Sequence, residues 1–169
     1  MKLLRLIVPS LLIAVGLLFF NVDGTRANEG STLEIPAIGV STPILSAPFV
    51  DGTWDVTHLH WTVAHLEMLP WFNTPTNVAL GGHSTDVNGN PDIFYNLHLL
   101  QAGDEIFVHV DGQVKRYIVD HLTNVAETDI HVLHPTTHEQ LTLFTCDLGS
   151  YSESTGWYTR RTVVVAYPA

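Results

Sequence analysis

The chain is poor in cysteine: Cys146 is the only one among its 169 residues. A lone cysteine has no partner for an intrachain disulfide, so a fold held together by disulfides is excluded. The thiol therefore serves either as a small buried hydrophobe or as a thiolate. It ends the apolar, β-branched run 141–146 and precedes the loop-like stretch 147–150. This position at the mouth of an expected strand favours the chemical role, because catalytic groups are often mounted there on a rigid scaffold.

Basic residues are scarce as well. Seven Lys and Arg stand against 17 Asp and Glu, which gives a formal net charge of −10. Two of the basic residues lie within the first twenty residues, where there is no acid, so the rest of the chain is more acidic still. Binding to a polyanion needs a basic surface, so nucleic acid is excluded as a partner. The 46% hydrophobic content fits one domain with its own core, plus an extra segment at the N-terminus.

That N-terminal segment, 1–22, has two basic residues followed by the apolar run 6–20. The pattern is typical of a signal peptide or a membrane anchor. We expect an uncleaved anchor helix of about 20 residues, with its basic end in the cytoplasm, because no convincing cleavage site follows. The polar stretch 23–32 would be a tether, and 33–169 a folded domain outside the cell membrane. Cleavage stays an alternative, since the apolar run is short.

Short runs of alternating or β-branched residues, separated by turn residues, predict strands throughout 33–169. They lie at 33–40, 42–45, 77–83, 104–110, 113–122, 141–146 and 162–166. A proline in the first run indicates an edge strand. Asp111 and Gly112, between the fourth and fifth runs, give a strong hairpin signal.

Little helix is expected. Leu59, Val63 and Leu66 have helical spacing, which predicts an amphipathic helix over 56–68 that stops at Pro70. A helical turn is expected within 93–100. Many short strands, no internal repeat and one or two short helices together predict an all-β barrel or sandwich.

Thiolate attack on a carbonyl needs a group that takes the thiol proton and a donor that stabilises the oxyanion. Among ten histidines, His83 stands out because it follows Gly81 and Gly82 at the end of a buried strand. Backbone can approach closely at glycine, so this side chain can be aimed into a cleft. His60 and His121 are the next candidates for the base. For the cation, an arginine that opens the closing strand is the best candidate, because that strand could lie beside the cysteine strand.

Three features stand in order along the chain: Gly-Gly-His at 81–83, Thr-Leu-Phe-Thr-Cys at 142–146 and Arg-Thr-Val-Val-Val-Ala at 161–166. Together they resemble the sortases, the membrane-anchored cysteine transpeptidases of mainly Gram-positive and related bacteria. The family's Thr-Leu-x-Thr-Cys signature is met at every fixed position, and its arginine lies five residues before an alanine, as Arg161 does. Further matches follow the histidine at Phe94, Leu97, Gly103 and Asp104. The resemblance covers nearly the whole chain.

The resemblance implies an eight-stranded β-barrel with a groove for an extended sorting signal, often of the Leu-Pro-x-Thr-Gly type. Cys146 would attack the Thr carbonyl to give a thioacyl enzyme. His83 would give and take protons at the leaving and incoming amines, and Arg161 would hold the carbonyl and its oxyanion. Thr145 would contact the substrate. Arg160 competes with Arg161, but adjacent strand residues face opposite ways, so the role goes to Arg161 on register.

The resemblance also implies partners: secreted proteins that carry a sorting signal, and an amine acceptor from a peptidoglycan precursor or a pilin lysine. No cofactor or metal would be needed. The subclass we expect is a class D to F-like enzyme. Two other functions stay open, namely a peptide-binding barrel without catalysis and a secreted, histidine-rich, metal-dependent hydrolase. The first would show a substitution at one of the three key positions, and none is seen.

Other polar and aromatic residues have simpler explanations. A Zn²⁺ ion could be gathered by His58, His60, His131, His134 and His138, but we favour scattered surface histidines because no His-Glu-x-x-His pattern occurs. The acids Glu127, Asp129, Asp147 and Glu153 fit either a Ca²⁺ site, as in some class A sortases, or a solvated surface. Core or groove walls are expected for Trp54, Trp61, Trp71 and Trp157.

Overall fold

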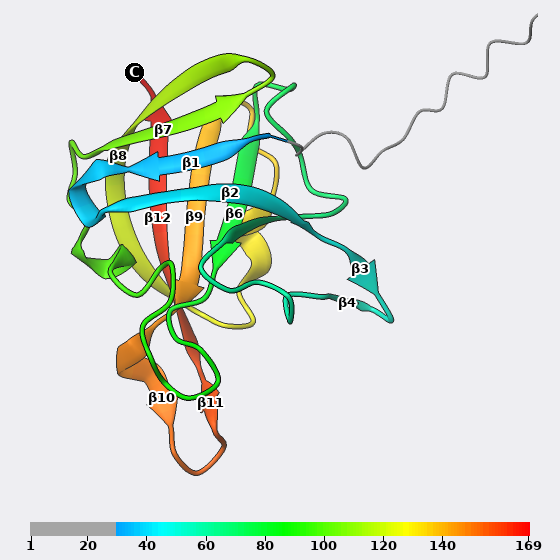
Figure 1. Ribbon diagram of the computed structural model, residues 1–169, viewed down its shortest axis with the longest axis vertical. Helices are drawn as coiled ribbons and strands as arrows, with labels where there is room; N and C mark the ends of the chain where they lie inside the picture. Colours follow the sequence, from blue (N-terminus) through cyan, green and yellow to red (C-terminus); the bar gives the residue numbers. More distant parts are fainter. Residues whose placement is uncertain (1–29) are drawn as a thin grey trace, which may run out of the picture.

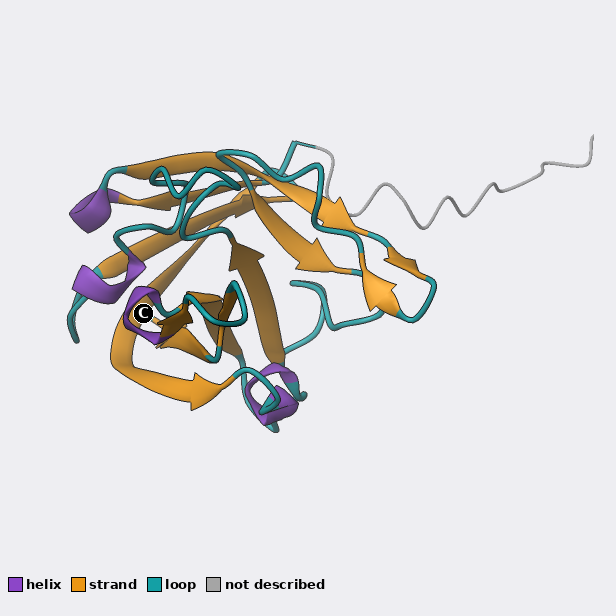
Figure 2. Ribbon diagram, turned by 90° about the horizontal axis from the view of Figure 1, so that it is seen from below, coloured by secondary structure: helices purple, strands orange, loops and turns teal. Residues whose placement is uncertain are grey.

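The computed structural model describes residues 30–169, so the predicted anchor at 1–22 and the tether up to residue 29 lie outside the described residues. From residue 30 onward, no helix is long and apolar enough to cross a membrane. Strands make up most of the ordered structure, and the helices between them are short 3-10 turns (Figure 1, Figure 2).

Eight strands close into one barrel. In order around the barrel they are β1 (Thr32–Ile35), β2 (Val40–Ala47), β5 (Val63–Leu66), β6 (Asn77–Gly82), β9 (Gln140–Cys146), β12 (Arg160–Pro168), β8 (Gln113–Ala126) and β7 (Glu105–Val110), which pairs with β1. Neighbours are antiparallel except for β2 with β5 and β6 with β9, which are parallel. The eight-stranded barrel implied by the sequence motifs is confirmed.

Two small hairpins lie outside the barrel. One joins β3 (Phe49–Val50) to β4 (Thr53–Trp54), and the other joins β10 (Tyr151–Ser152) to β11 (Trp157–Tyr158). Figure 1 shows the first to the right of the barrel and the second below it. The 3-10 turns of residues 30–169 are η2 (Pro36–Ile38), η3 (Leu97–Leu99), η4 (Ile130–Leu133) and η5 (Leu148–Ser150).

Alternation along the strands gives the barrel an inside and an outside. Leu80, Leu143 and Val164 lie in one row across β6, β9 and β12, and all three belong to the buried interior cluster. The next residues along, Gly81 and Phe144, therefore face outward. Phe144 packs there against a second, smaller apolar cluster on the outer surface. Residues that share the parity of Phe144 in this part of the sheet consequently face the outside of the barrel.

The two glycines at the end of β6 make room for aromatic rings on both faces. A Cβ on Gly81 would lie 2.6 Å from the Phe144 ring outside, and one on Gly82 would lie 2.8 Å from the Phe94 ring inside. Either separation is far below van der Waals contact. The expectation that glycine permits close approach just before His83 is therefore confirmed.

The helix predicted over 56–68 is wrong. The stretch 55–62 is a turn-rich connection, and the strand β5 follows it. All four residues of β5 are buried, since Val63 packs inside the barrel while Ala64 and Leu66 pack in the outer cluster. A short strand buried on both faces has no exposed polar positions to reveal its period of two. The apolar residues Val63 and Leu66 of this strand happen to have helical spacing with Leu59, which explains the wrong prediction.

The edge-strand interpretation of 33–40 is also wrong. Pro36 opens the 3-10 turn η2 between β1 and β2, and β1 is paired on both sides by β2 and β7. The hairpin predicted at Asp111 and Gly112 is confirmed, because both residues have positive φ, 52° and 72°, between the paired strands β7 and β8.

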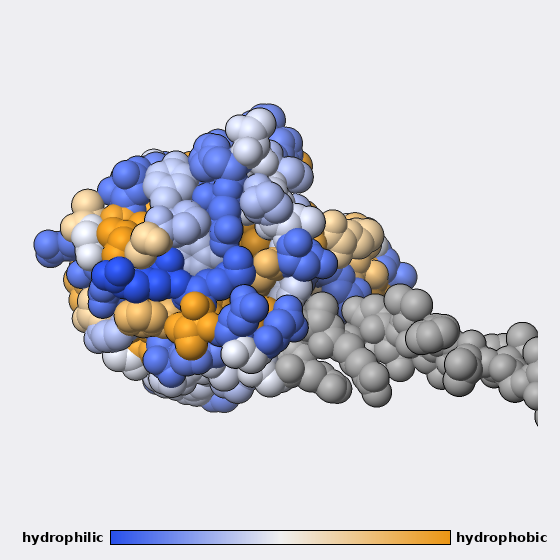
Figure 3. Space-filling view, turned by 90° about the horizontal axis from the view of Figure 1, so that it is seen from above, coloured by the Kyte–Doolittle hydropathy of each residue, from blue (hydrophilic) through white to orange (hydrophobic). Residues whose placement is uncertain are grey.

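Figure 3 shows the end of the barrel opposite the β10–β11 hairpin. Hydrophilic residues cover most of this face, and the apolar spots between them are small and separate. Small separate spots do not favour a large partner interface there.

Candidate active site

His83, which directly follows the end of β6, lies in one row with Cys146 of β9 and Arg161 of β12. Gly81 pairs with Phe144 between the parallel strands β6 and β9, so His83 and Cys146, each two residues further on, stand at the same level. On the other side of β9, Arg161 of β12 pairs directly with Cys146. These residues share the outward parity of Phe144, so all three side chains belong to the outer face of the barrel. Residues 63 positions apart along the chain are thus brought together at the ends of two parallel strands.

One groove of about 910 Å³ is lined by all three of these residues. Its apolar walls come from the 55–62 connection, β5 and Phe144, including Val56, Leu59, Ala64 and Leu66. The β10–β11 hairpin supplies Trp157 and Tyr158. A second cavity of about 570 Å³ also touches Cys146, but neither His83 nor Arg161 lines it. The larger groove is therefore the one in which the thiol has a base and a cation beside it.

The Cys146 thiol is partly buried. Burial raises its pKa above the ordinary thiol value, the Arg161 charge opposes that rise, and the Glu127 carboxylate adds to it. Raising the thiol pKa favours the neutral form, so a positive neighbour is needed to populate the thiolate. Arg161 supplies that charge from the paired position on β12.

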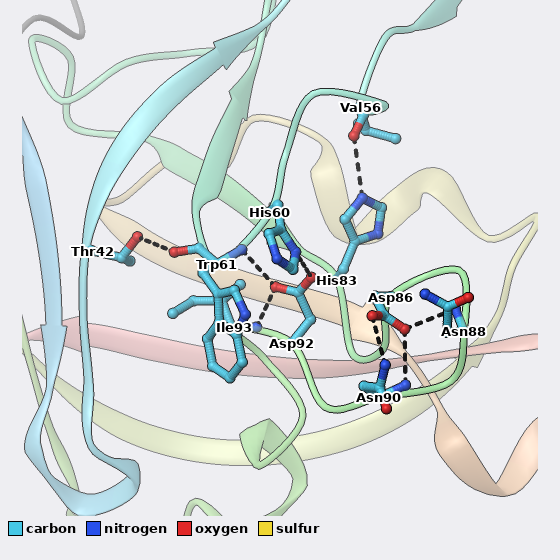
Figure 4. Close-up of polar contacts among 10 residues, drawn as sticks. All are labelled: Thr42, Val56, His60, Trp61, His83, Asp86, Asn88, Asn90, Asp92 and Ile93. Carbon is cyan, nitrogen blue, oxygen red and sulfur yellow. Dashed lines mark hydrogen bonds and ion pairs between the residues drawn. The ribbon is translucent and has the colours of Figure 1, made fainter.

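The His83 ring is oriented by a backbone carbonyl. Its Nε2 atom lies 3.2 Å from the Val56 carbonyl oxygen (Figure 4). A carbonyl oxygen can only accept, so Nε2 carries the proton and donates this bond. In the neutral ring, Nδ1 is then the unprotonated nitrogen, and it is the atom that can take a proton from a thiol or an amine.

The Arg161 guanidinium is held by the segment that precedes it. Nη1 donates to the carbonyl oxygens of Tyr158 at 2.9 Å and Arg160 at 3.0 Å. Nη2 lies 3.5 Å from Oε2 of Glu127, and the group stacks on Trp157 with its centre 5.8 Å from the ring centroid. Only 22% of the side chain is exposed, so the cation is partly withdrawn from water.

Arg160 has a different set of partners. Its Nε and Nη2 atoms both lie 2.8 Å from Oδ2 of Asp147, whose Oδ1 accepts from the Gly149 N–H and caps η5. Arg160 does not line the groove, whereas Arg161 does. The sequence register that assigned the groove to Arg161 agrees with this placement, while its catalytic role remains a prediction.

Thr145, the residue predicted to contact substrate, has the opposite parity to Cys146 and is 4% exposed. Its hydroxyl donates to the Gly82 carbonyl oxygen at 2.8 Å. This bond ties β9 to β6 directly before His83. Thr145 thus fixes the spacing between the two strands that carry the thiol and the imidazole, and substrate contact remains a prediction.

The other histidines proposed for the base or for a metal lie apart from this row. His60 contacts Asp92, and His121 contacts Asp120 on β8; neither lines the groove. His131 and His134 contact each other, with their Nδ1 atoms 3.4 Å apart. Across 30–169, no three His, Cys, Asp or Glu side chains gather in a metal-binding arrangement.

Some parts of the site gave no signal in the sequence. Val56 acts through its carbonyl, so neither its residue type nor its spacing pointed to it. Glu127, in the connection after β8, stood out only as a possible Ca²⁺ ligand, and nothing in the sequence linked it to Cys146. Among the tryptophans, Trp71 is buried in the core and Trp157 lines the groove, as expected. Trp61 is 53% exposed and lines neither cavity, so the interpretation as core or groove wall is wrong for this residue.

A thiol, an imidazole and a guanidinium that line one open groove have the make-up of a cysteine-dependent acyl-transfer site. The sortase-domain family model matches residues 33–169. The chain therefore belongs to the sortase family, and the resemblance carried by its motifs is confirmed.

Sortase A of Staphylococcus aureus is 32% identical over 92 residues, which cover 53% of this chain and 43% of that relative. The chain thus aligns with less than half of that relative's length. Sortase C-1 from Actinomyces oris superposes with a TM-score of 0.66 at 29% identity, covering 82% of this chain and 72% of that one. Sortase A from Corynebacterium diphtheriae gives 0.65 at 27% identity, covering 82% of this chain and 60% of that one. Because similar structures carry class A, class C and class D names, the class D to F expectation remains a prediction.

Proposed function

We propose that this protein is a cysteine transpeptidase that cleaves a Leu-Pro-x-Thr-Gly-like sorting signal after its Thr and joins the new Thr carboxyl end of the amino-terminal fragment to an amine. The observation that carries the proposal is the row of His83, Cys146 and Arg161 in one groove. Membership of the sortase family supports the reaction class.

In the first step the Cys146 thiolate attacks the substrate Thr carbonyl carbon and forms a C–S bond. The carbonyl electrons move onto oxygen, and the Arg161 guanidinium stabilises the resulting negative charge. His83, in its imidazolium form, gives a proton to the leaving amine as the C–N bond breaks. The products are a thioester on Cys146 and the released amine.

In the second step an acceptor amine attacks the thioester. His83 takes the proton from the attacking amine, a C–N bond forms, and the C–S bond breaks to return the thiolate. No cofactor takes part in either step. Because burial raises the pKa of Cys146, only a fraction of molecules holds the thiolate and imidazolium together at neutral pH.

The proposal extends to location and partners. The apolar run 6–20 would anchor the protein in the cell membrane, with the barrel outside the cell. Its donors would be secreted proteins with sorting signals, and its acceptor an amine of a peptidoglycan precursor or a pilin lysine.

The test is capture of the thioacyl intermediate. The full chain, solubilised in detergent, is incubated with a library of sorting-type peptides, and Cys146 adducts are identified by mass spectrometry. We expect an adduct that carries the peptide up to its Thr, and its release when an amine is added. Turnover by a Cys146→Ala variant on any such peptide would overturn the proposal. Activity that survives a chelator but is lost on alkylation of Cys146 separates this function from a metal-dependent hydrolase.

The role of His83 has its own test. If His83 and Cys146 titrate as a coupled pair, the rate should depend on pH as a bell whose two limbs belong to the pair. His83→Gln should flatten the bell and remove most of the rate. An unchanged profile in that variant would move the base to another histidine, with His60 and His121 tested next.

A further inference from the structure

One buried carboxylate close to the site has no part in the mechanism above. Asp92 lies in the loop between His83 and η3, and 2% of its side chain is exposed. Its Oδ1 atom accepts the backbone N–H of Trp61 at 2.8 Å and that of Ile93 at 2.6 Å, while Oδ2 lies 3.1 Å from Nδ1 of His60 (Figure 4). Burial of a carboxylate is costly without such partners. Two of the three come from a segment about thirty residues earlier, so Asp92 joins two loops.

The segment that Asp92 holds is under backbone strain at its end. Trp61 has φ of 55°, in the left-handed region that a tryptophan rarely adopts. Its N–H is held by Asp92, and its carbonyl oxygen accepts from the buried Thr42 hydroxyl at 3.0 Å. The indole side chain is largely exposed, so packing of that ring does not impose the conformation. Hydrogen bonds on both sides of one residue therefore fix the strained turn.

The other end of the same segment touches His83. The Val56 carbonyl that accepts from Nε2 also accepts the N–H of Leu59 at 3.2 Å, and Leu59 is buried in the outer cluster. Val56 and Trp61 are thus the two ends of one short turn, with the imidazole at one end and Asp92 at the other (Figure 4).

The loop that carries His83 is closed by the same region. The Asp92 N–H donates to the Ser84 carbonyl at 3.0 Å, and the Phe94 N–H donates to the His83 carbonyl at 3.0 Å. Asp92 therefore sits where the backbone of His83 and the turn over its ring meet. Among the contacts within 30–169, the only hydrogen bond of the His83 ring is the one to Val56, and no carboxylate pairs with it directly.

We propose that Asp92 is a positioning residue for His83: through the turn 56–61 it holds the Val56 carbonyl against Nε2, and so fixes which ring nitrogen faces the reacting groups. The catalytic consequence of this inference rests on the proposed function, whereas the orientation of the His83 ring does not depend on it. The carboxylate that would orient the base directly in a Ser-His-Asp arrangement is here replaced by a carboxylate that acts through a loop.

The test compares three variants of the full chain in detergent. Asp92→Ala removes both carboxylate oxygens that join the two loops, whereas Asp92→Asn keeps an oxygen that can occupy the place of Oδ1 between Trp61 and Ile93. Asp104→Ala is the matched control, because Asp104 accepts the backbone N–H of Gln101 at 2.8 Å within its own loop and lines neither cavity. Each variant is assayed for kcat at saturating sorting-type peptide, for Tm, and for the ¹⁵N shifts of the His83 ring.

We expect Asp92→Ala to lower kcat roughly 10- to 100-fold, the range for a reacting group misplaced by about 1 Å. The His83 ¹⁵N shifts should move from the Nε2-protonated pattern toward a mixture of tautomers. Asp92→Asn should restore most of kcat and the original shifts, and Asp104→Ala should change neither.

A lower Tm in Asp92→Ala, with unchanged kcat below the melting range and unchanged His83 shifts, would overturn the proposal, since Asp92 would then only stabilise the loop. Equal losses of kcat in Asp92→Ala and Asp104→Ala would overturn it as well. If the wild-type chain forms no thioacyl adduct with any peptide, the proposed function fails instead, and the His83 shifts alone decide whether Asp92 orients the ring.

Discussion

Replacing Arg161 by lysine separates charge from geometry at the oxyanion site. Two bonds from Nη1 to backbone carbonyls and the stacking on Trp157 hold the planar group, leaving other N–H donors to meet a substrate. Lysine keeps the charge but has no fork that can hold those carbonyls and reach the groove together. The expected loss is therefore that of one oxyanion donor, about 2.7–4 kcal/mol, or roughly 10²- to 10³-fold in rate.

The assay is the initial rate of transpeptidation on one peptide for Arg161→Lys and, as a control, for Arg160→Ala. Arg160 is half exposed and bound to Asp147 outside the groove. An exposed ion pair of this kind contributes at most about 1 kcal/mol, so its loss should change the rate by no more than about fivefold. Folding of both variants is checked by their melting temperatures.

A severe loss at Arg160 together with a mild loss at Arg161 would refute the reasoning. It would mean that β12 is out of register with β9 by one residue in the active protein. The paired positions Arg161 and Cys146 would then no longer face the same groove.

Three further predictions follow from the same site. Cys146→Ala should abolish transpeptidation with little change in Tm, because a small side chain at a strand end contributes little packing, and Cys146→Ser should be nearly inactive; product analysis by mass spectrometry checks both. Burial and Glu127 raise the pKa of Cys146, while Arg161 lowers it. The pH at which the rate of iodoacetamide alkylation rises should therefore be lower in Glu127→Gln and higher in Arg161→Ala than in the wild type. Shifts of the same sign in both variants would contradict these assignments. Gly82→Ala should lower the free energy of unfolding by about 1–3 kcal/mol in urea titrations, since the new Cβ would lie 2.8 Å from the Phe94 ring, and an unchanged midpoint would show that the ring can move away.

The parts of the fold that the sequence predicts well are those with visible alternation. The hairpin at Asp111 and Gly112 has turn residues that only a few backbone conformations accept, and β9 and β12 carry β-branched runs. The strand β5 was not predicted because all four of its residues are buried, so its sequence shows no alternation of buried and exposed positions. The edge-strand prediction at Pro36 was wrong because this residue belongs to a turn between two paired strands and not to a strand.

The site divides in the same way. His83, Cys146 and Arg161 could be found because each is a reactive residue type in a recognisable local motif. What surrounds them could not, because it depends on tertiary contacts between distant segments. The Val56 carbonyl accepts a hydrogen bond from His83, 27 positions away in the sequence. Glu127, in a different connection, raises the pKa of Cys146. A backbone carbonyl leaves no mark in the residue sequence at all.

The closed barrel has a consequence for how a peptide can be held. The barrel strands that border the outer groove, namely β5, β6, β9 and β12, each pair with a neighbour on both sides, so an extended peptide in this groove finds no free edge of these strands to which it could add. Main-chain ladder bonds, which would bind any sequence alike, are therefore not provided by these strands. Affinity in the outer groove must come from side chains and from the loops that line it, such as 55–62 and the β10–β11 hairpin. Substitution of groove-lining side chains in these two segments, other than Trp157, would change which peptides bind while leaving the Val56 and Tyr158 carbonyls that hold the imidazole and the guanidinium in place.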